Sequence, residues 1–191
     1  MRNFSVVFIF LVIVGYVSGQ EKIEFPSSDG IVITADQYKI SDDATWIVLC
    51  HQARSSRGEY KEIAPKLNKL GFNCLAVDLR SGSEMNFVEN ENAKRAKEKS
   101  LPISYLAAEK DIVSAIEYVY KLKKKPLILF GSSYSASLAL KIAPKNEKIK
   151  AVVVFSPGEY LTTEGVTLKT SLPGFDKSVY AACTANEYDV M

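Results

Sequence analysis

Short runs of continuous apolar residues recur along the chain, and charged or amphipathic stretches separate them. Four runs are rich in branched or aromatic side chains and a weaker fifth follows, at residues 46–50, 72–77, 127–130, 151–155 and 179–183. Continuous apolar sequence is typical of strands that are buried on both faces of a mainly parallel sheet. Residues 31–38 instead alternate apolar and polar, as an exposed or edge strand does, and a hairpin with residues 23–25 is expected.

The intervening stretches predict helices. One apolar stripe has a helical period and stops at Gly71, where a glycine cap belongs; its members are Tyr60, Ile63, Ala64, Leu67 and Leu70. A second stripe consists of Ile112, Ala115, Ile116, Val119 and Leu122. A third helix is expected from Tyr134 towards Pro144, and residues 89–99 predict a surface loop or short helix. The alternation predicts an α/β fold: a doubly wound, mainly parallel sheet with an antiparallel N-terminal edge and helices on both faces.

The first 19 residues have the pattern of a secretory signal peptide. Arg2 precedes an apolar run over residues 4–17, and small residues follow at Val17, Ser18 and Gly19. We expect cleavage before Gln20, a mature domain over residues 20–191, and a secreted or periplasmic location without a stable membrane anchor. An uncleaved anchor is the alternative.

Net charge and cysteine spacing bear on two classes of function, nucleic-acid binding and chemistry at cysteine residues. Loss of Arg2 with the leader lowers the net charge from +2 to +1, so nothing favours nucleic acid as a partner. Cys50, Cys74 and Cys183 lie in strand-like runs without metal-ligand spacing, which predicts buried, unreactive thiols.

The most specific motif surrounds Ser133. A predicted strand runs into Gly131, Ser133 and Ser135, and a helical pattern follows at once. This is the layout of a nucleophile elbow, G-x-S-x-G, with Ser135 in place of the last glycine. Small residues on both sides allow the helix to cross close to the strand, and the start of the helix offers free N–H groups to an oxyanion. An ordinary strand-to-helix turn with a serine N-cap is the alternative.

With two further motifs, the chain resembles the alpha/beta-hydrolase superfamily and, within it, the dienelactone-hydrolase-like serine hydrolases. These motifs are Cys50-His51-Gln52-Ala53 after the third strand and Asp78-Leu79-Arg80-Ser81-Gly82 after the fourth. The resemblance covers most of the mature chain. It implies a small acyl compound as substrate, with no metal or organic cofactor.

The resemblance also implies roles for individual residues. Ser133 matches the nucleophile, and the backbone N–H of Tyr134 matches one oxyanion donor. The second donor would be the N–H of Ala53 or Gln52. For the acid that orients the catalytic histidine, the best match is Glu187, with Asp189 and Glu159 as alternatives.

The family's histidine has no match, because His51 is the only histidine and lies on the oxyanion loop. His51 is expected to brace that loop, with a role as substitute base as the alternative. The sequence stops where the family's last helix, last strand and histidine loop would follow, so we expect a chain that is truncated at its C-terminus. Two functions remain open: an exported serine hydrolase, or an inactive hydrolase-like binding module or non-functional fragment. The oligomeric state is open.

Overall fold

A computed structural model describes residues 19–190, apart from the side chains of Thr163, Tyr188, Asp189 and Val190. The predicted signal peptide lies almost wholly outside these residues. Within them a seven-stranded sheet has the order β1-β2-β4-β3-β7-β8-β9. The strands are β1 (Gln20–Pro26), β2 (Val32–Tyr38), β3 (Thr45–Cys50), β4 (Phe72–Val77), β7 (Leu127–Ser132), β8 (Ile149–Phe155) and β9 (Ser178–Ala182). The strands from β4 to β9 run parallel, and β1 and β2 are antiparallel, as predicted.

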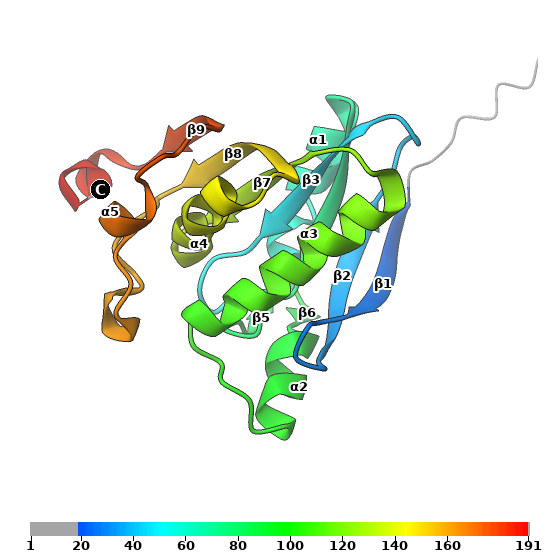
Figure 1. Cartoon of the computed structure of the whole chain (residues 1–191). Coiled ribbons are helices and arrows are strands. Elements are labelled where there is room, and N and C mark those ends of the chain that lie inside the picture. Colours follow the sequence, from blue (N-terminus) through cyan, green and yellow to red (C-terminus); the bar gives the residue numbers. More distant parts are fainter. Residues whose placement is uncertain (1–18, 191) are drawn as a thin grey trace, which may run out of the picture.

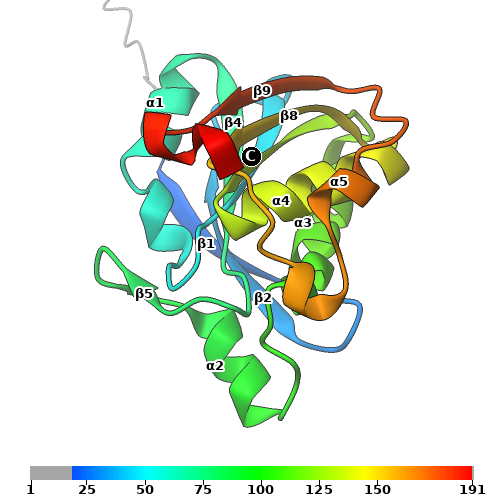
Figure 2. The same cartoon turned by 90° about the vertical axis from the view of Figure 1, so that its left-hand side faces the viewer.

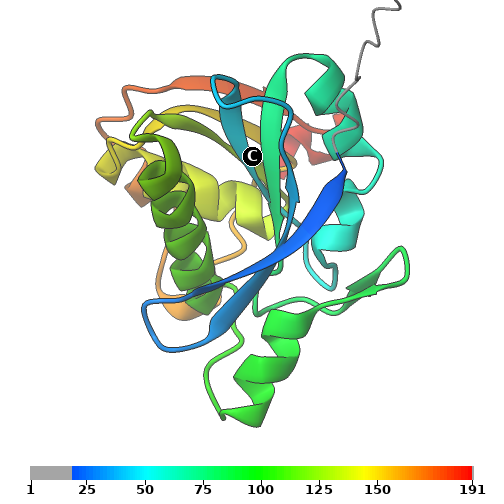
Figure 3. The ribbon, with the colours of Figure 1, turned by 90° about the vertical axis from the view of Figure 1, so that its right-hand side faces the viewer.

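Helices lie on both faces of the sheet (Figure 1). The helices are α1 (Ile63–Lys69), α2 (Glu91–Glu98), α3 (Glu109–Lys123), α4 (Tyr134–Ile142) and α5 (Leu168–Ser171). Shorter 3-10 turns are η1 (Arg57–Tyr60), η2 (Leu106–Ala108), η3 (Ala143–Lys145), η4 (Thr162–Glu164) and η5 (Ala185–Val190), and a small hairpin is formed by β5 (Glu84–Met85) and β6 (Val88–Glu89). Figure 3 shows α3 and α4 on one side of the sheet and the segment with η1 and α1 on the other.

The main core lies between the sheet and helices α3 and α4. The stripe of Ile112, Ala115, Ile116 and Val119 is buried there as predicted, whereas Leu122 at the end of α3 is 46% exposed. Helix α4 is the most deeply buried, since every residue from Tyr134 to Leu140 is inaccessible or nearly so. A smaller core on the other face contains Tyr60, Ala64 and side chains of β3 and β4.

The alternating segment at residues 31–38 is neither an edge nor exposed, which corrects the prediction. It forms β2, which lies between β1 and β4; its polar residues Thr34 and Asp36 are buried, and Gln37 is half-buried. The N–H of Thr34 donates to Asn92, and Oδ1 of Asp36 pairs with Arg57, so these two residues have partners within the protein in place of solvent.

The three cysteines are free thiols, with Cys50 and Cys74 buried and Cys183 half-buried. Burial raises the pKa of Cys74 to about 12, which keeps it in the unreactive thiol form. No helix within residues 19–190 combines the length and apolar character needed to cross a bilayer.

Candidate active site at the carboxyl edge of the sheet

Ser133 occupies a strained turn between β7 and α4. Its backbone has φ 57° and ψ −126°, a region that is sparsely populated for residues with a side chain and costs roughly 1–3 kcal/mol. Hydrogen bonds on both sides hold this conformation: the Ser133 N–H donates to the carbonyl of Phe155, and the Ser133 carbonyl accepts from Ala136. The sharp turn predicted from the motif is therefore present, with a half-buried serine at its apex.

Gly131 and Ser135 explain how α4 starts so close to the sheet. A Cβ atom on Gly131 would lie 2.5 Å from the carbonyl oxygen of Ser135 and 2.6 Å from the Cα atom of Ala136, so no side chain fits there. Ser135 is tolerated because its buried hydroxyl accepts a hydrogen bond from the N–H of Ser132 and lies 2.7 Å from the carbonyl oxygen of Cys50. The bare motif did not reveal this bracing role of Ser135.

Two backbone N–H groups near Ser133 are available to an oxyanion. Tyr134 is the first residue of α4, so its N–H has no acceptor within the helix. On the neighbouring strand, Cys50 is in register with Gly131, which brings the loop after β3 to the elbow. In that loop the N–H of Gln52 donates to Glu59, whereas the N–H of Ala53 has no acceptor among residues 19–190. These contacts favour Ala53 over Gln52 as the second donor.

His51 is fully buried, and both of its ring nitrogens are engaged. Nε2 lies 2.9 Å from the backbone nitrogen of Leu79, which can only donate, so Nδ1 carries the proton and donates to the carbonyl of Gln52 at 2.7 Å. Desolvation lowers the pKa of His51 to about 4. The ring thus joins the loops after β3 and β4, and these contacts favour the structural role over a role as substitute base.

The loop after β4 braces the same edge through two buried ion pairs. Arg57 donates to Asp78 through its backbone N–H at 2.9 Å and its guanidinium at 2.6 Å, which fastens the loop after β3 to β4. Arg80 is fully buried and binds Asp111 of α3 and Asp29 of the β1–β2 turn. The sequence singled out Asp78 and Arg80 as parts of a motif, but their partners are distant along the chain and could not be predicted.

The three candidate acids have different surroundings. Glu187 lies on η5, which directly follows β9 (Figure 2). Its Oε2 atom accepts hydrogen bonds from the Ser156 hydroxyl at 2.7 Å and from the N–H and hydroxyl of Thr184, both at 3.0 Å. The Ser156 bond, with those from Thr184, lowers the pKa of Glu187. Glu159 instead accepts from the backbone N–H groups at the start of α5, and the side chain of Asp189 lies outside what the structure describes.

Hydrogen bonds connect Ser133 to the segment of Glu187 along one edge. Ser133 donates to Phe155 at the end of β8, and the next residue, Ser156, donates from its N–H to Ala182 at the end of β9. Ser156 then reaches Glu187 through its hydroxyl. The structure therefore brings Ser133, Tyr134, Ala53 and Glu187 to the same edge of the sheet, where active-site groups of open α/β sheets gather.

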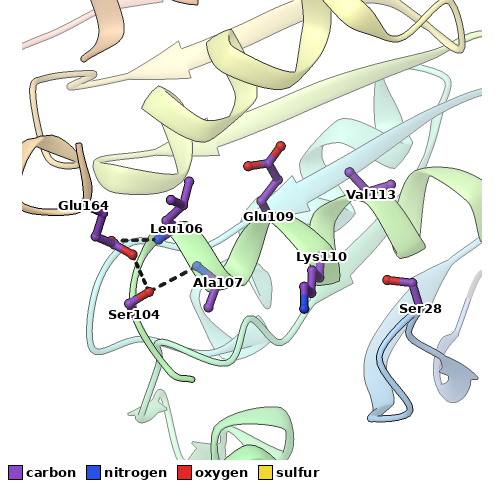
Figure 4. A pocket seen from close by; sticks show the side chains of 8 residues that line it. All are labelled: Ser28, Ser104, Leu106, Ala107, Glu109, Lys110, Val113 and Glu164. Atoms are coloured by element: carbon purple, nitrogen blue, oxygen red, sulfur yellow. Dashed lines mark hydrogen bonds between the residues drawn. The ribbon is translucent and has the colours of Figure 1, made fainter. Parts of the chain in front are cut away.

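A cavity of about 510 Å³ lies elsewhere, at the start of α3 (Figure 4). Leu106, Ala107 and Val113 supply apolar walls, and Glu164 accepts hydrogen bonds from Ser104 and Leu106 at its rim. None of the predicted site residues lines it. Among the described residues, no cluster of histidine, cysteine, aspartate or glutamate side chains could hold a metal ion.

No protein-family profile and no curated protein sequence matches this chain. Many solved structures do match its fold. An esterase from Pyrococcus furiosus is 14% identical with a TM-score of 0.64, over 98% of this chain and 82% of the esterase. A dienelactone hydrolase from Anabaena variabilis is 14% identical with a TM-score of 0.62, over 87% of this chain and 85% of that enzyme.

Other neighbours are considerably longer. The chain matches 46% of the alpha/beta hydrolase GrgF from Penicillium, with a TM-score of 0.58 and 14% identity, and 46% of the protein DcsB. At these identities the likeness defines the fold. This chain has the alpha/beta-hydrolase fold, as its three motifs predicted.

Proposed function

We propose that this protein is an exported serine hydrolase that cleaves a carboxylic ester or related acyl bond through an acyl-enzyme at Ser133. The strained backbone of Ser133 carries the proposal, because a strained serine turn beside free N–H groups is the arrangement that acyl transfer needs. The solved structures of esterases and hydrolases with this fold support the reaction class.

In the proposed reaction the Ser133 oxygen attacks the carbonyl carbon while an imidazole takes its proton. The N–H groups of Tyr134 and Ala53 stabilise the tetrahedral oxyanion, and Glu187 orients the imidazole. The intermediate then expels the alcohol, which takes the proton from the imidazolium. Water, deprotonated by the same base, releases the acyl group and regenerates the serine.

These 191 residues do not supply the general base that would take the proton of Ser133. Their only histidine is His51, whose ring is buried and doubly bonded. A serine hydroxyl without a base is a poor nucleophile. The proposal therefore requires an imidazole from elsewhere, such as a longer form of the protein. The same observation favours the second candidate, a hydrolase-like module that binds a ligand without turning it over.

Fluorophosphonate labelling with and without added imidazole distinguishes the two candidates. We expect little labelling of the folded 191-residue chain alone, and labelling of Ser133 once free imidazole is added as an external base. Peptide mass spectrometry locates the adduct. Ser133→Ala should abolish labelling, and Ser132→Ala, which changes the adjacent serine, should retain it.

Two other outcomes would contradict this assignment. Folded protein that stays unlabelled at Ser133 with imidazole present would favour the binding module. Strong labelling without imidazole that disappears in His51→Ala would identify His51 as the base.

A further inference from the structure

The two carboxylate oxygens of Glu187 have different surroundings. Oε2 accepts three hydrogen bonds, from the hydroxyl of Ser156 and from the N–H and hydroxyl of Thr184. Oε1 accepts no hydrogen bond among the described residues. A carboxylate held in this way has one oxygen occupied and the other free to accept a proton donor.

Ser156 is fixed in position by its own backbone. Its φ of 50° is unusual for a residue with a side chain, and its N–H donates to the carbonyl of Ala182 at 2.7 Å. The residue before it, Phe155, accepts the hydrogen bond from the N–H of Ser133. Ser156 therefore lies between the elbow and the acid, and its hydroxyl direction is set by the ends of β8 and β9.

We propose that Ser156 is a positioning residue, which together with Thr184 holds Oε2 of Glu187 so that Oε1 is presented to the N–H of the activating imidazole. This role rests on the proposed function. In this role the hydroxyl of Ser156 orients Glu187 and is not required for the stability of the fold. The strained backbone supports it, since strain persists where the surrounding structure enforces a particular geometry.

A glycine variant separates this role from a purely structural one. Ser156→Gly removes the hydroxyl but accommodates the positive φ at least as well as serine, so the midpoint of thermal unfolding should not fall. The carboxyl pKa of Glu187, followed by carbon-13 NMR, should rise towards its ordinary value, because one donor to the ionised form is lost. Thr184→Val should act in the same direction.

A matched control is available at Ser104, whose hydroxyl also donates to a glutamate, Glu164, at 2.5 Å (Figure 4). Ser104→Ala should leave the pKa of Glu187 unchanged. In the imidazole-assisted labelling experiment, Ser156→Gly should label Ser133 roughly tenfold more slowly than the natural chain, because the base is less well oriented.

The outcomes separate this inference from the proposed function. An unchanged pKa of Glu187 in Ser156→Gly would show that the Ser156 hydroxyl does not donate to the Glu187 carboxylate, and would overturn this inference. A raised pKa with an unchanged labelling rate would overturn the positioning role while leaving the hydrolase in place. Absence of any Ser133 labelling in the natural chain with imidazole would reject the hydrolase, and with it this role.

Discussion

The hydroxyl oxygen of Ser135 lies 2.7 Å from the carbonyl oxygen of Cys50 on the adjacent strand β3. It also lies 2.9 Å from the backbone nitrogen of Ser132, from which it accepts a hydrogen bond. The residue that replaces the last glycine of the elbow motif thus connects the turn to β3, the strand that precedes the loop of His51 and Ala53. A glycine at this position could not make either contact.

Ser135→Ala should therefore destabilise the protein. The change removes the buried hydroxyl that accepts from the part-buried N–H of Ser132, at a cost of about 1–3 kcal/mol. Urea unfolding followed by circular dichroism measures the loss. Ser178→Ala, at an exposed position on β9, should stay within about 0.5 kcal/mol of the natural chain. Equal stability of the two variants would show that the Ser135 contacts contribute nothing.

Ser133→Gly should make the protein more stable. Glycine adopts φ 57° and ψ −126° without the strain that serine bears, so we expect a gain of about 1 kcal/mol in the free energy of unfolding. The neighbouring substitution Ser132→Gly falls at the end of β7, where φ is not positive, and should destabilise by about 0.5–1 kcal/mol. Changes of the same sign in both variants would contradict strain at the elbow.

Acid should destabilise the fold through His51. Its pKa is about 4 in the folded protein against 6.5 as the ordinary value, so between these pH values the unfolded chain binds a proton that the folded protein does not. The free energy of unfolding should fall as the pH drops from 6.5 towards 4, by about 3 kcal/mol in total from this group, and then level off.

Measurement of that free energy at several pH values, for the natural chain and for His51→Gln, isolates the effect of the ring. The variant should lose less stability between pH 6.5 and pH 5, because it has no imidazole to protonate. Parallel curves, or an imidazole that titrates near 6.5 in the folded protein by NMR, would disprove the burial of a neutral His51.

Breaking the buried pair of Arg80 and Asp111 should be far more costly than breaking an exposed pair. Both side chains are inaccessible, and Asp111→Ala leaves the buried guanidinium with Asp29 as its one remaining carboxylate partner among the described residues, at a cost of about 3–5 kcal/mol. Asp43→Ala removes the partner of Lys125 at the surface and should change stability by less than about 1 kcal/mol. Thermal unfolding of both variants tests this; a mild effect of Asp111→Ala would show that Asp29 alone suffices for Arg80.

We predict that the mature protein begins at or near Gln20. Strand β1 starts at Gln20, so cleavage there would leave the whole described sheet intact. N-terminal sequencing of the protein from its native host provides the measurement. An intact Met1 on protein that has remained in the cytoplasm would refute export.

The fold could be predicted because its strands are continuous apolar runs and its helices carry clear apolar stripes. The elbow could be located because the small residues that it requires lie within two positions of Ser133, where they form a recognisable short motif. The prediction for strand β2 was wrong because its burial depends on residues that are distant along the chain. Its alternation indicated exposure, but residues distant along the chain contact its polar side chains: Arg57 pairs with Asp36, and Arg95 donates to the hydroxyl of Thr34.

Contacts between distant segments also limited the prediction of the site. Sequence spacing alone left Ala53 and Gln52 equivalent as oxyanion donors, and only the bond from Gln52 to Glu59 separates them. The resemblance made Glu187 the best match for the acid but left Asp189 and Glu159 open as alternatives. The structure shows that the surroundings of Glu187 and Glu159 differ, because Glu159 accepts from the start of α5, a helix whose four residues are too few for a periodic pattern.

The single histidine gives this molecule a built-in spectroscopic probe. His51 contacts the loop after β3 through Gln52 and the loop after β4 through Leu79. Since no other imidazole is present in the 191 residues, its ring signals need no assignment by mutagenesis. Any compound that displaces either loop will shift these resonances, so a ligand library can be screened on unlabelled protein before a substrate is known.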